Sequence, residues 1–222
     1  MKIRFSIANK LILGITVIIL AILVNSYIIN NTLSKSKKIN KKITELYVPS
    51  SSHLNQLYNE VNRSKALIRS WVFIDKRTGT PDKVRLRQIQ NQEIPELHDE
   101  ISKIAEGWEK EEQQKYQQIY KAIQDTLFEQ HKEIMGNLSS IESYDDPMLL
   151  FEITPKVEEG GEIITLTNRI LTDISSLRQT MQQKVEDSRV QMNAIFDRFE
   201  RFILLLGITL TVLSIIIALL LT

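Results

Sequence analysis

The last third of the chain carries a pattern of apolar positions that predicts one long helix. From Ile163 to Phe199 apolar residues recur with a mean step of about 3.6, which places them in one stripe along a helix. The stretch Phe202 to Leu221 follows, with fifteen Phe, Leu, Ile or Val residues and no charge. At about 1.5 Å per residue it is long enough to cross a hydrocarbon core of about 30 Å. No Pro or Gly separates the two patterns, so we expect one rod that begins in water and ends in a bilayer.

A second apolar segment, Leu11 to Ile29, lies near the start of the chain and holds thirteen Leu, Ile or Val residues. A tail of residues 1–10 precedes it and carries Lys2, Arg4 and Lys10. A secretory signal peptide is the alternative interpretation, because it too has a basic start and an apolar run. We favour an uncleaved membrane anchor, since the run is longer than a usual signal core and no A-x-A-like site precedes a polar start.

Two spans would place both chain ends on one side of a membrane, and the basic residues disagree about which side. The charges of the tail favour a cytoplasmic location for residues 1–10. Five lysines between Lys35 and Lys42 favour the opposite orientation. Loops longer than about 60 residues translocate largely regardless of charge, so the positive-inside rule does not decide the location of residues 30–201. Charge alone leaves the topology open.

The region between the spans, residues 30–201, has a helical pattern almost throughout and is large enough for one domain with its own core. Pro49 predicts a kink or a restart in the first helix, with the three following serines available as a cap. Turns are predicted at residues 78–82 and 143–147, and a bend at Pro95. The last helix is expected to begin near Met148 and to tolerate a weak point at residues 160–161.

Four such segments predict an all-α fold, an up-down antiparallel four-helix bundle anchored in a membrane by two transmembrane helices. The expected order is a cytoplasmic tail at 1–10, the first span at 11–29, an extracytoplasmic domain at 30–201 and the second span at 202–221. The first and last helices are expected to exceed the other two in length. We therefore expect a two-helix membrane-proximal stalk that leads to a bundle formed by residues 49–177.

Composition and motifs argue against several classes of function. The chain has 222 residues, a net charge of +1 and no Cys, so nothing suggests a nucleic-acid partner, a disulfide or a thiolate site. His53, His98 and His131 fall on different segments without metal-ligand spacing, and surface positions are the ordinary expectation for them. No H-E-x-x-H, G-x-S-x-G or Walker-type sequence is present. We expect no enzyme activity, no catalytic residues, no bound metal and no cofactor.

One basic cluster suggests a ligand site. Arg63, Lys65 and Arg69 lie beside apolar positions of the first helix, so at least one cation should face the seam of the bundle. Guanidinium groups suit carboxylates because they donate two parallel hydrogen bonds. Ordinary surface basic residues are the plainer interpretation. Several aromatic residues of the central region could form either part of the bundle core or a ligand cage. They are Trp71, Phe73, Trp108, Tyr116 and Tyr120.

The arrangement of two spans around a helical region resembles the four-helix-bundle sensor module of methyl-accepting chemotaxis proteins, which also occurs on some sensor kinases. The likeness covers nearly the whole chain. Local runs that are similar to members of that group are Tyr47-Val48-Pro49-Ser50-Ser51-Ser52-His53-Leu54, Glu93-Ile94-Pro95-Glu96-Leu97, Trp108 and Tyr144-Asp145-Asp146-Pro147.

The resemblance implies a multi-pass protein of the bacterial cell membrane with a periplasmic or extracellular bundle that forms a homodimer through its first helix. It implies a small-molecule ligand, an amino acid or organic acid, or a periplasmic protein partner. Arg63 and Arg69 match the arginines that bind such ligands in the family. Family members continue into a cytoplasmic output region, whereas this sequence ends at Thr222. We therefore expect either a sensor fragment or a protein without its own output.

Two functions follow from these observations. The first is the sensor module of a transmembrane signal-transduction receptor, which detects a solute or partner outside the membrane and displaces its last helix, as in chemotaxis receptors. The alternative is a membrane-anchored helical adaptor or structural protein that binds a protein partner without sensing a ligand.

Overall fold

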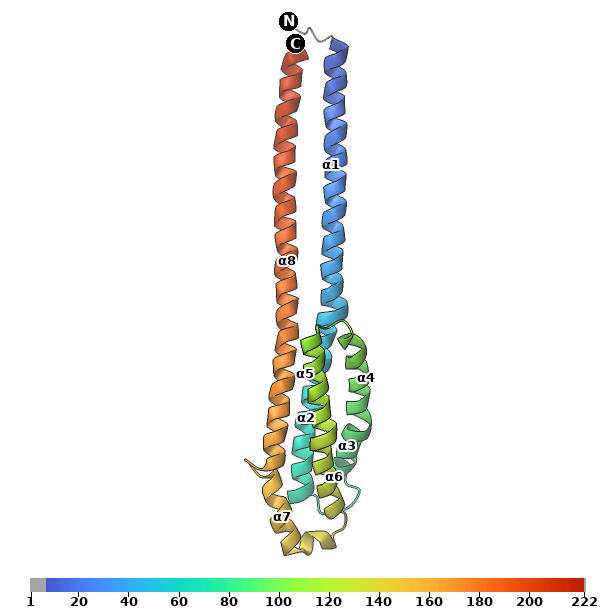
Figure 1. Cartoon of the computed structure of the whole chain (residues 1–222), viewed down its shortest axis with the longest axis vertical. Coiled ribbons are helices and arrows are strands. Elements are labelled where there is room, and N and C mark those ends of the chain that lie inside the picture. Colours follow the sequence, from blue (N-terminus) through green and yellow to red (C-terminus); the bar gives the residue numbers. More distant parts are fainter. Residues whose placement is uncertain (1–6, 222) are drawn as a thin grey trace. The chain divides into compact units, whose positions relative to one another are not determined.

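The computed structural model describes residues 7–221 and is built of helices joined by short turns (Figure 1). The first run comprises α1 (Ile7–Lys42), the π-helical turn η1 (Ile43–Tyr47) and α2 (Val48–Phe73). The next comprises α3 (Pro81–Gln88), the π turn η2 (Ile89–Glu93) and α4 (Ile94–Ala105). Then follow α5 (Lys110–Lys121), the π turn η3 (Ala122–Leu127), α6 (Phe128–Asn137), the 3₁₀ turn η4 (Glu142–Asp145), α7 (Pro147–Val157) and α8 (Glu162–Leu221).

The described residues contain no β-strand, which confirms the predicted all-α class. Lys2 and Arg4 of the predicted tail lie outside the described residues. The chain divides into two compact units, one formed by residues 1–43 and 186–222 and the other by residues 44–185. We describe each unit by itself.

The first unit combines α1 with the C-terminal part of α8. Gly14 lies against Ile217, because a Cβ atom added to the glycine would be 3.3 Å from the Cδ1 atom of Ile217. Large apolar side chains are exposed along both helices, among them Ile18, Leu23, Leu205, Ile208 and Leu219. Both helices are long and apolar enough to cross a membrane, and no residue of the most apolar stretch of the C-terminal one is buried. A surface of this kind suits lipid better than water.

The second unit has one continuous hydrophobic core to which every helix between α2 and α8 contributes. Helix α2 packs against α3, α4, α6 and α7. The apolar stripe predicted on the last helix faces this core as far as Val185, which is itself buried. Core residues on α2 and α8 are Leu54, Leu57, Val61, Ile68, Trp71, Val72, Ile163, Ile170, Leu171, Ile174, Leu177 and Met181.

Pro49 at the start of α2 and Pro95 at the start of α4 do not interrupt the helical backbone. The residues before these two helices, Tyr47 and Glu93, keep helical backbone angles of φ −74°, ψ −41° and φ −69°, ψ −43°. Proline lacks an N–H group and its ring clashes with the carbonyl four residues earlier, and the wider π turn before each proline gives the ring room. The chain stays helical through Pro49, so the predicted restart is wrong, whereas the predicted kink stays a prediction.

The serines after Pro49 do not cap a new helix. The hydroxyl of Ser50 donates to the Leu46 carbonyl at 2.5 Å and accepts a hydrogen bond from Nε1 of Trp108 at 2.8 Å. Both Ser50 and Trp108 are buried, so the hydroxyl joins α2 to the turn before α5 through a fully satisfied polar contact.

The predicted single helix from Met148 is also wrong, because the chain breaks between α7 and α8. Residues 158–161 form a turn in which Gly160 has φ +84°, a left-handed angle that favours glycine. A Cβ atom on Gly161 would lie 2.3 Å from the Pro155 carbonyl oxygen. The two glycines therefore let α8 start directly after the end of α7 rather than weaken a continuous helix.

The Tyr144-to-Pro147 run builds the corner that precedes α7. The buried Tyr144 hydroxyl donates to the Trp71 carbonyl at 2.7 Å and accepts from the Lys83 ammonium at 3.1 Å. Asp146 caps α7, since its carboxylate accepts hydrogen bonds from the backbone of Met148 and Leu149. The predicted turn at 143–147 is confirmed, and its residues have local structural roles.

His131 is fully buried on α6, whereas a surface position was expected for it. Its Nδ1 atom lies 3.2 Å from Nε2 of Gln90, and its Nε2 atom is buried without a partner among the described residues. Burial lowers the pKa of His131 to about 3, because no charged group compensates the loss of water around an imidazolium.

We expect this histidine to make the second unit less stable in acid. The unfolded chain protonates His131 below about pH 6.5, whereas the folded chain does so only near pH 3. Stability is therefore full above pH 6.5 and falls as the pH decreases through that window, by up to about tenfold in the folding equilibrium per pH unit. Urea unfolding between pH 7 and 5 should show a smaller pH dependence in His131→Gln.

Candidate functional site

The strongest candidate site is a groove between α2 and α8 within the second unit. It has a cavity volume of about 500 Å³, in the range of small-molecule sites. Helix α2 contributes residues one helical turn or two turns apart, and α8 lines the opposite wall with amide and hydroxyl side chains. The lining residues are Tyr58, Asn62, Lys65, Asn168, Leu171, Thr172, Ser175, Ser176 and Gln179.

The charge of this groove is positive. Among the described residues that line it, Lys65 is basic and none is acidic. The Lys65 ammonium donates to Oδ1 of Asn168 at 3.1 Å, and an ammonium has three donors, so donors are left for a ligand. Surrounding hydroxyl and amide groups can both donate and accept hydrogen bonds. The groove is thus suited to a small polar anion.

A second cation lies beside the Tyr58 end of the groove. The Arg178 guanidinium stands 5.6 Å from the centre of the Tyr58 ring and donates to Oδ1 of Asn55. Tyr58 and Lys65 are seven residues apart on α2, which corresponds to about 10 Å along the helix axis. The groove is therefore flanked by positive charge toward both of its ends.

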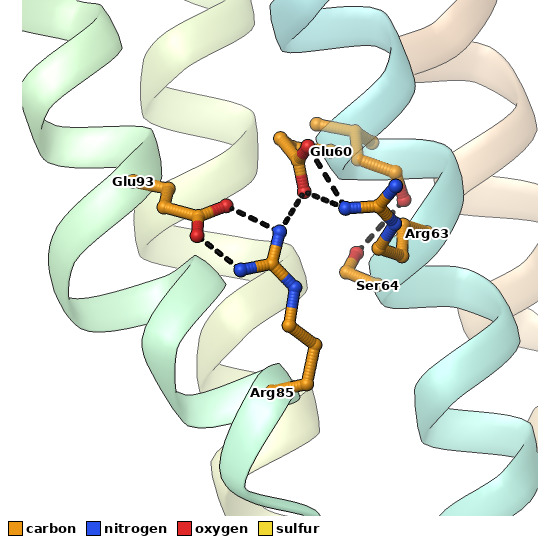
Figure 2. A network of polar contacts seen from close by, with 6 residues as sticks. Glu60, Arg63, Ser64, Arg85 and Glu93 are labelled. Atoms are coloured by element: carbon orange, nitrogen blue, oxygen red, sulfur yellow. Dashed lines mark hydrogen bonds and ion pairs between the residues drawn. The ribbon is translucent and has the colours of Figure 1, made fainter. Parts of the chain in front are cut away.

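Arg63 is not among the described residues that line this groove and belongs instead to a network of four charged side chains (Figure 2). Arg85 of α3 donates to Glu93 with both terminal nitrogens, one of them at 2.8 Å, and its Nη2 atom lies 3.3 Å from Glu60. Arg63 donates to the same Glu60 carboxylate at 3.3 Å. Figure 2 shows Arg85 between the two glutamates and Arg63 on the far side of Glu60. The network joins α2 to α3 and η2.

Glu60 is the carboxylate shared by both arginines. Burial raises the pKa of Glu60, and the nearby Glu93 adds to this effect, while Arg63 and Arg85 oppose it. The Glu60 carboxylate forms ion pairs with both guanidinium groups, so Arg63 is already paired with an anion of the protein itself. A free ligand would have to compete with Glu60 for Arg63.

The structure does not bring Arg63 and Arg69 to the same face of α2. Their positions differ by six, which places them about 120° apart around the helix. Arg69 is exposed and is four residues from Lys65, so these two share a face. The assignment of Arg63 and Arg69 as ligand contacts stays a prediction, and the geometry adds Lys65 as the cation that lines a groove.

Comparison with known protein families, with curated proteins and with solved structures found no match.

The chemistry that the groove offers to a ligand is hydrogen bonding beside a positive charge. None of its described lining residues is His, Asp or Glu, and the described residues hold no group of three or more His, Cys, Asp or Glu side chains arranged for a metal ion. That no metal is bound stays a prediction. Convergent hydrogen-bond donors near a positive charge are what recognition of a carboxylate requires.

Sequence reasoning missed the wall formed by α8. A signal was present, because Asn168, Thr172, Ser175 and Gln179 follow one another at steps of three or four beside the apolar stripe. Short uncharged polar residues on such a line leave space between helices and supply hydrogen bonds. The line alone did not indicate which side chains of α2 it would face.

Proposed function

We propose that this chain is the sensor module of a transmembrane signal-transduction receptor, similar to those of chemotaxis receptors. Residues 44–185 would bind a small carboxylate, an amino acid or organic acid, in the groove between α2 and α8. The observation that carries this proposal is the groove itself, a cavity with Lys65 on one wall, hydroxyls and amides on the other and no acidic lining residue.

The architecture proposed for this function is an up-down antiparallel four-helix bundle. The four members would be α2, α3 with α4, α5 with α6, and α7 with α8, since all of them contribute to one core and are joined by short turns. Two transmembrane helices and a two-helix stalk would anchor the bundle. The exposed apolar surfaces of α1 and of the C-terminal part of α8 support this arrangement.

Helix α8 is the element that would carry the signal. It runs for 60 residues from Glu162 to Leu221, so residues that line the groove and residues apolar enough for a membrane belong to one helix. A ligand that bridges α2 and α8 favours one arrangement of the pair over another. A shift of about 1–2 Å between packed helices is enough for a switch with two discrete states.

The proposal includes a location and a partner. The bundle would lie in the periplasm or outside the cell, with both chain ends in the cytoplasm, and two copies of the chain would associate through the first helix. The charge pattern is compatible with this orientation because the long central region translocates largely regardless of its lysines.

A ligand screen on the full chain in detergent tests the proposal. Amino acids and small organic acids would be added at millimolar concentrations, and thermal unfolding would be followed by circular dichroism. A ligand that binds the folded state at about 100 times its Kd adds about 2.7 kcal/mol, so we expect a raised midpoint for at least one carboxylate. An unchanged midpoint with every member of the panel would contradict the sensor assignment.

A helical adaptor that binds a protein partner is the second candidate. It is supported by Met148 and Phe151 of α7, which are each 83% exposed although they are large and apolar. Such side chains are ordinary anchors of protein interfaces. Loss of partner capture in a Met148→Ser, Phe151→Ser double variant, together with a negative ligand screen, would favour this function.

A further inference from the structure

A second cleft lies between α4 and α5 and shares no lining residue with the α2–α8 groove, the proposed carboxylate site. It has a cavity volume of about 430 Å³ and lies within the second unit. Aromatic and polar side chains dominate its walls. The lining residues are His98, Ser102, Ala105, Glu106, Gln113, Tyr116, Gln117 and Tyr120.

Three rings form a stack along one side of this cleft. The imidazole of His98 lies parallel to the Tyr120 ring, with centroids 3.5 Å apart and planes 5° apart. It also stacks on Tyr116 at 5.7 Å, and the Tyr116 hydroxyl is 2.9 Å from its Nδ1 atom. Tyr116 is buried and packs edge-on against Trp108 at 5.8 Å. The rings therefore pack against one another, and Tyr120 is half-buried.

The electrostatic character of the cleft is opposite to that of the α2–α8 groove. Glu106 lies in its lining, and none of the described lining residues is Lys or Arg. The negative charge of Asp99 acts on all three rings, since it contributes to raising the pKa of Tyr116 and Tyr120 and opposes the lowering of the His98 pKa. Burial nevertheless lowers the pKa of His98, because the charged imidazolium loses contact with water.

We propose that the α4–α5 cleft binds a small organic ammonium ion against its aromatic lining at Tyr120, with the Glu106 carboxylate of the same cleft as the counter-charge. An aromatic face attracts a cation through its quadrupole, and a carboxylate adds a direct charge interaction. An anion would meet the Glu106 carboxylate, and none of the described lining residues is a Lys or Arg that could compensate it. This site is independent of the carboxylate groove, so one chain has two clefts of opposite charge preference.

Titration calorimetry of the full chain in detergent tests this proposal, with tetramethylammonium, choline and n-butylamine as probes. At least one should bind, and 3,3-dimethylbutan-1-ol, the neutral analogue of choline, should not. Tyr120→Leu keeps an apolar side chain of similar reach but removes the ring, and it should weaken binding about fivefold, the ratio that one cation–π contact supplies. Tyr120→Phe keeps the ring and should change affinity less than twofold.

Glu106→Gln separates the charge interaction from the ring. It should weaken binding by about threefold at low salt and by less at 0.5 M salt, where the carboxylate is screened. Unchanged circular dichroism in each variant confirms that the fold is intact. The proposal is overturned if none of the three cations binds, if the neutral alcohol binds equally well, or if Tyr120→Leu binds like the natural chain. None of these results bears on the carboxylate groove.

Discussion

Replacing Gly161 with Ala is expected to lower the free energy of unfolding by about 3 kcal/mol, the cost of forcing strained backbone contacts. The added methyl carbon would lie 2.3 Å from the Pro155 carbonyl oxygen and 2.6 Å from that of Lys156. Both obstacles are backbone atoms at the end of α7, so neither can rotate away as a side chain would. The clash can be relieved only if α7 and α8 move apart, and that movement disturbs the core at Val157 and Ile163.

Thermal unfolding of the full chain in detergent measures this effect. For a chain of this size about 3 kcal/mol corresponds to a decrease of the midpoint by about 6 to 12 °C. Gly136→Ala is the matched control, because nothing lies within 4 Å of a Cβ at Gly136 and alanine suits a helix better than glycine. That variant should be unchanged or slightly more stable. Equal unfolding midpoints for Gly161→Ala and Gly136→Ala would contradict the close backbone packing at the turn before α8.

Lys65→Ala is expected to weaken carboxylate binding by at least about tenfold, if the groove between α2 and α8 is the ligand site. A hydrogen bond to a charged group contributes about 1.5–3 kcal/mol, and a tenfold loss corresponds to about 1.4 kcal/mol. The side chain of Lys65 is only partly buried, so its removal should leave the fold intact. The shift of the unfolding midpoint caused by the ligand should largely disappear in this variant.

Variants of neighbouring residues make this test specific. Arg63→Ala should leave most of the ligand effect, because its guanidinium faces Glu60 rather than the groove. Arg69→Ala, on the same face as Lys65, should cause an intermediate loss, and Lys65→Arg should retain part of the binding. A full ligand effect in Lys65→Ala combined with its loss in Arg63→Ala would move the site to the other face of α2.

The periodicity of the sequence predicted the helices and much of the core, because burial of one stripe follows directly from a repeat of about 3.6 residues. Ile170, Leu177 and Met181 are buried as that pattern requires. The break at Gly160 and Gly161 was not predictable in the same way. A glycine costs a helix only about 1 kcal/mol relative to alanine, so composition does not decide between a weak helix and a turn.

The site was harder to predict than the fold because it depends on contacts between distant parts of the chain. Arg63, Lys65 and Arg69 are all cationic side chains in the sequence. Which of them lines the groove depends on how α2 is rotated about its axis relative to the helices packed against it. Lys65 meets Asn168, 103 residues later, whereas Arg63 meets Glu60 on its own helix. The burial of His131 likewise arises from the helices packed around α6, which the local sequence does not reveal.

The most direct test of the account asks whether residues 44–185 lie on one side of a membrane and both chain ends on the other. The chain has no Cys, so the single substitutions Lys2→Cys, Lys121→Cys and Thr222→Cys each introduce one thiol. Intact cells would be treated with a membrane-impermeant maleimide before and after permeabilisation. We predict that the thiol at position 121 reacts in intact cells and that those at 2 and 222 react only after permeabilisation. Reaction of all three thiols under the same condition would contradict a receptor in which α8 crosses the bilayer.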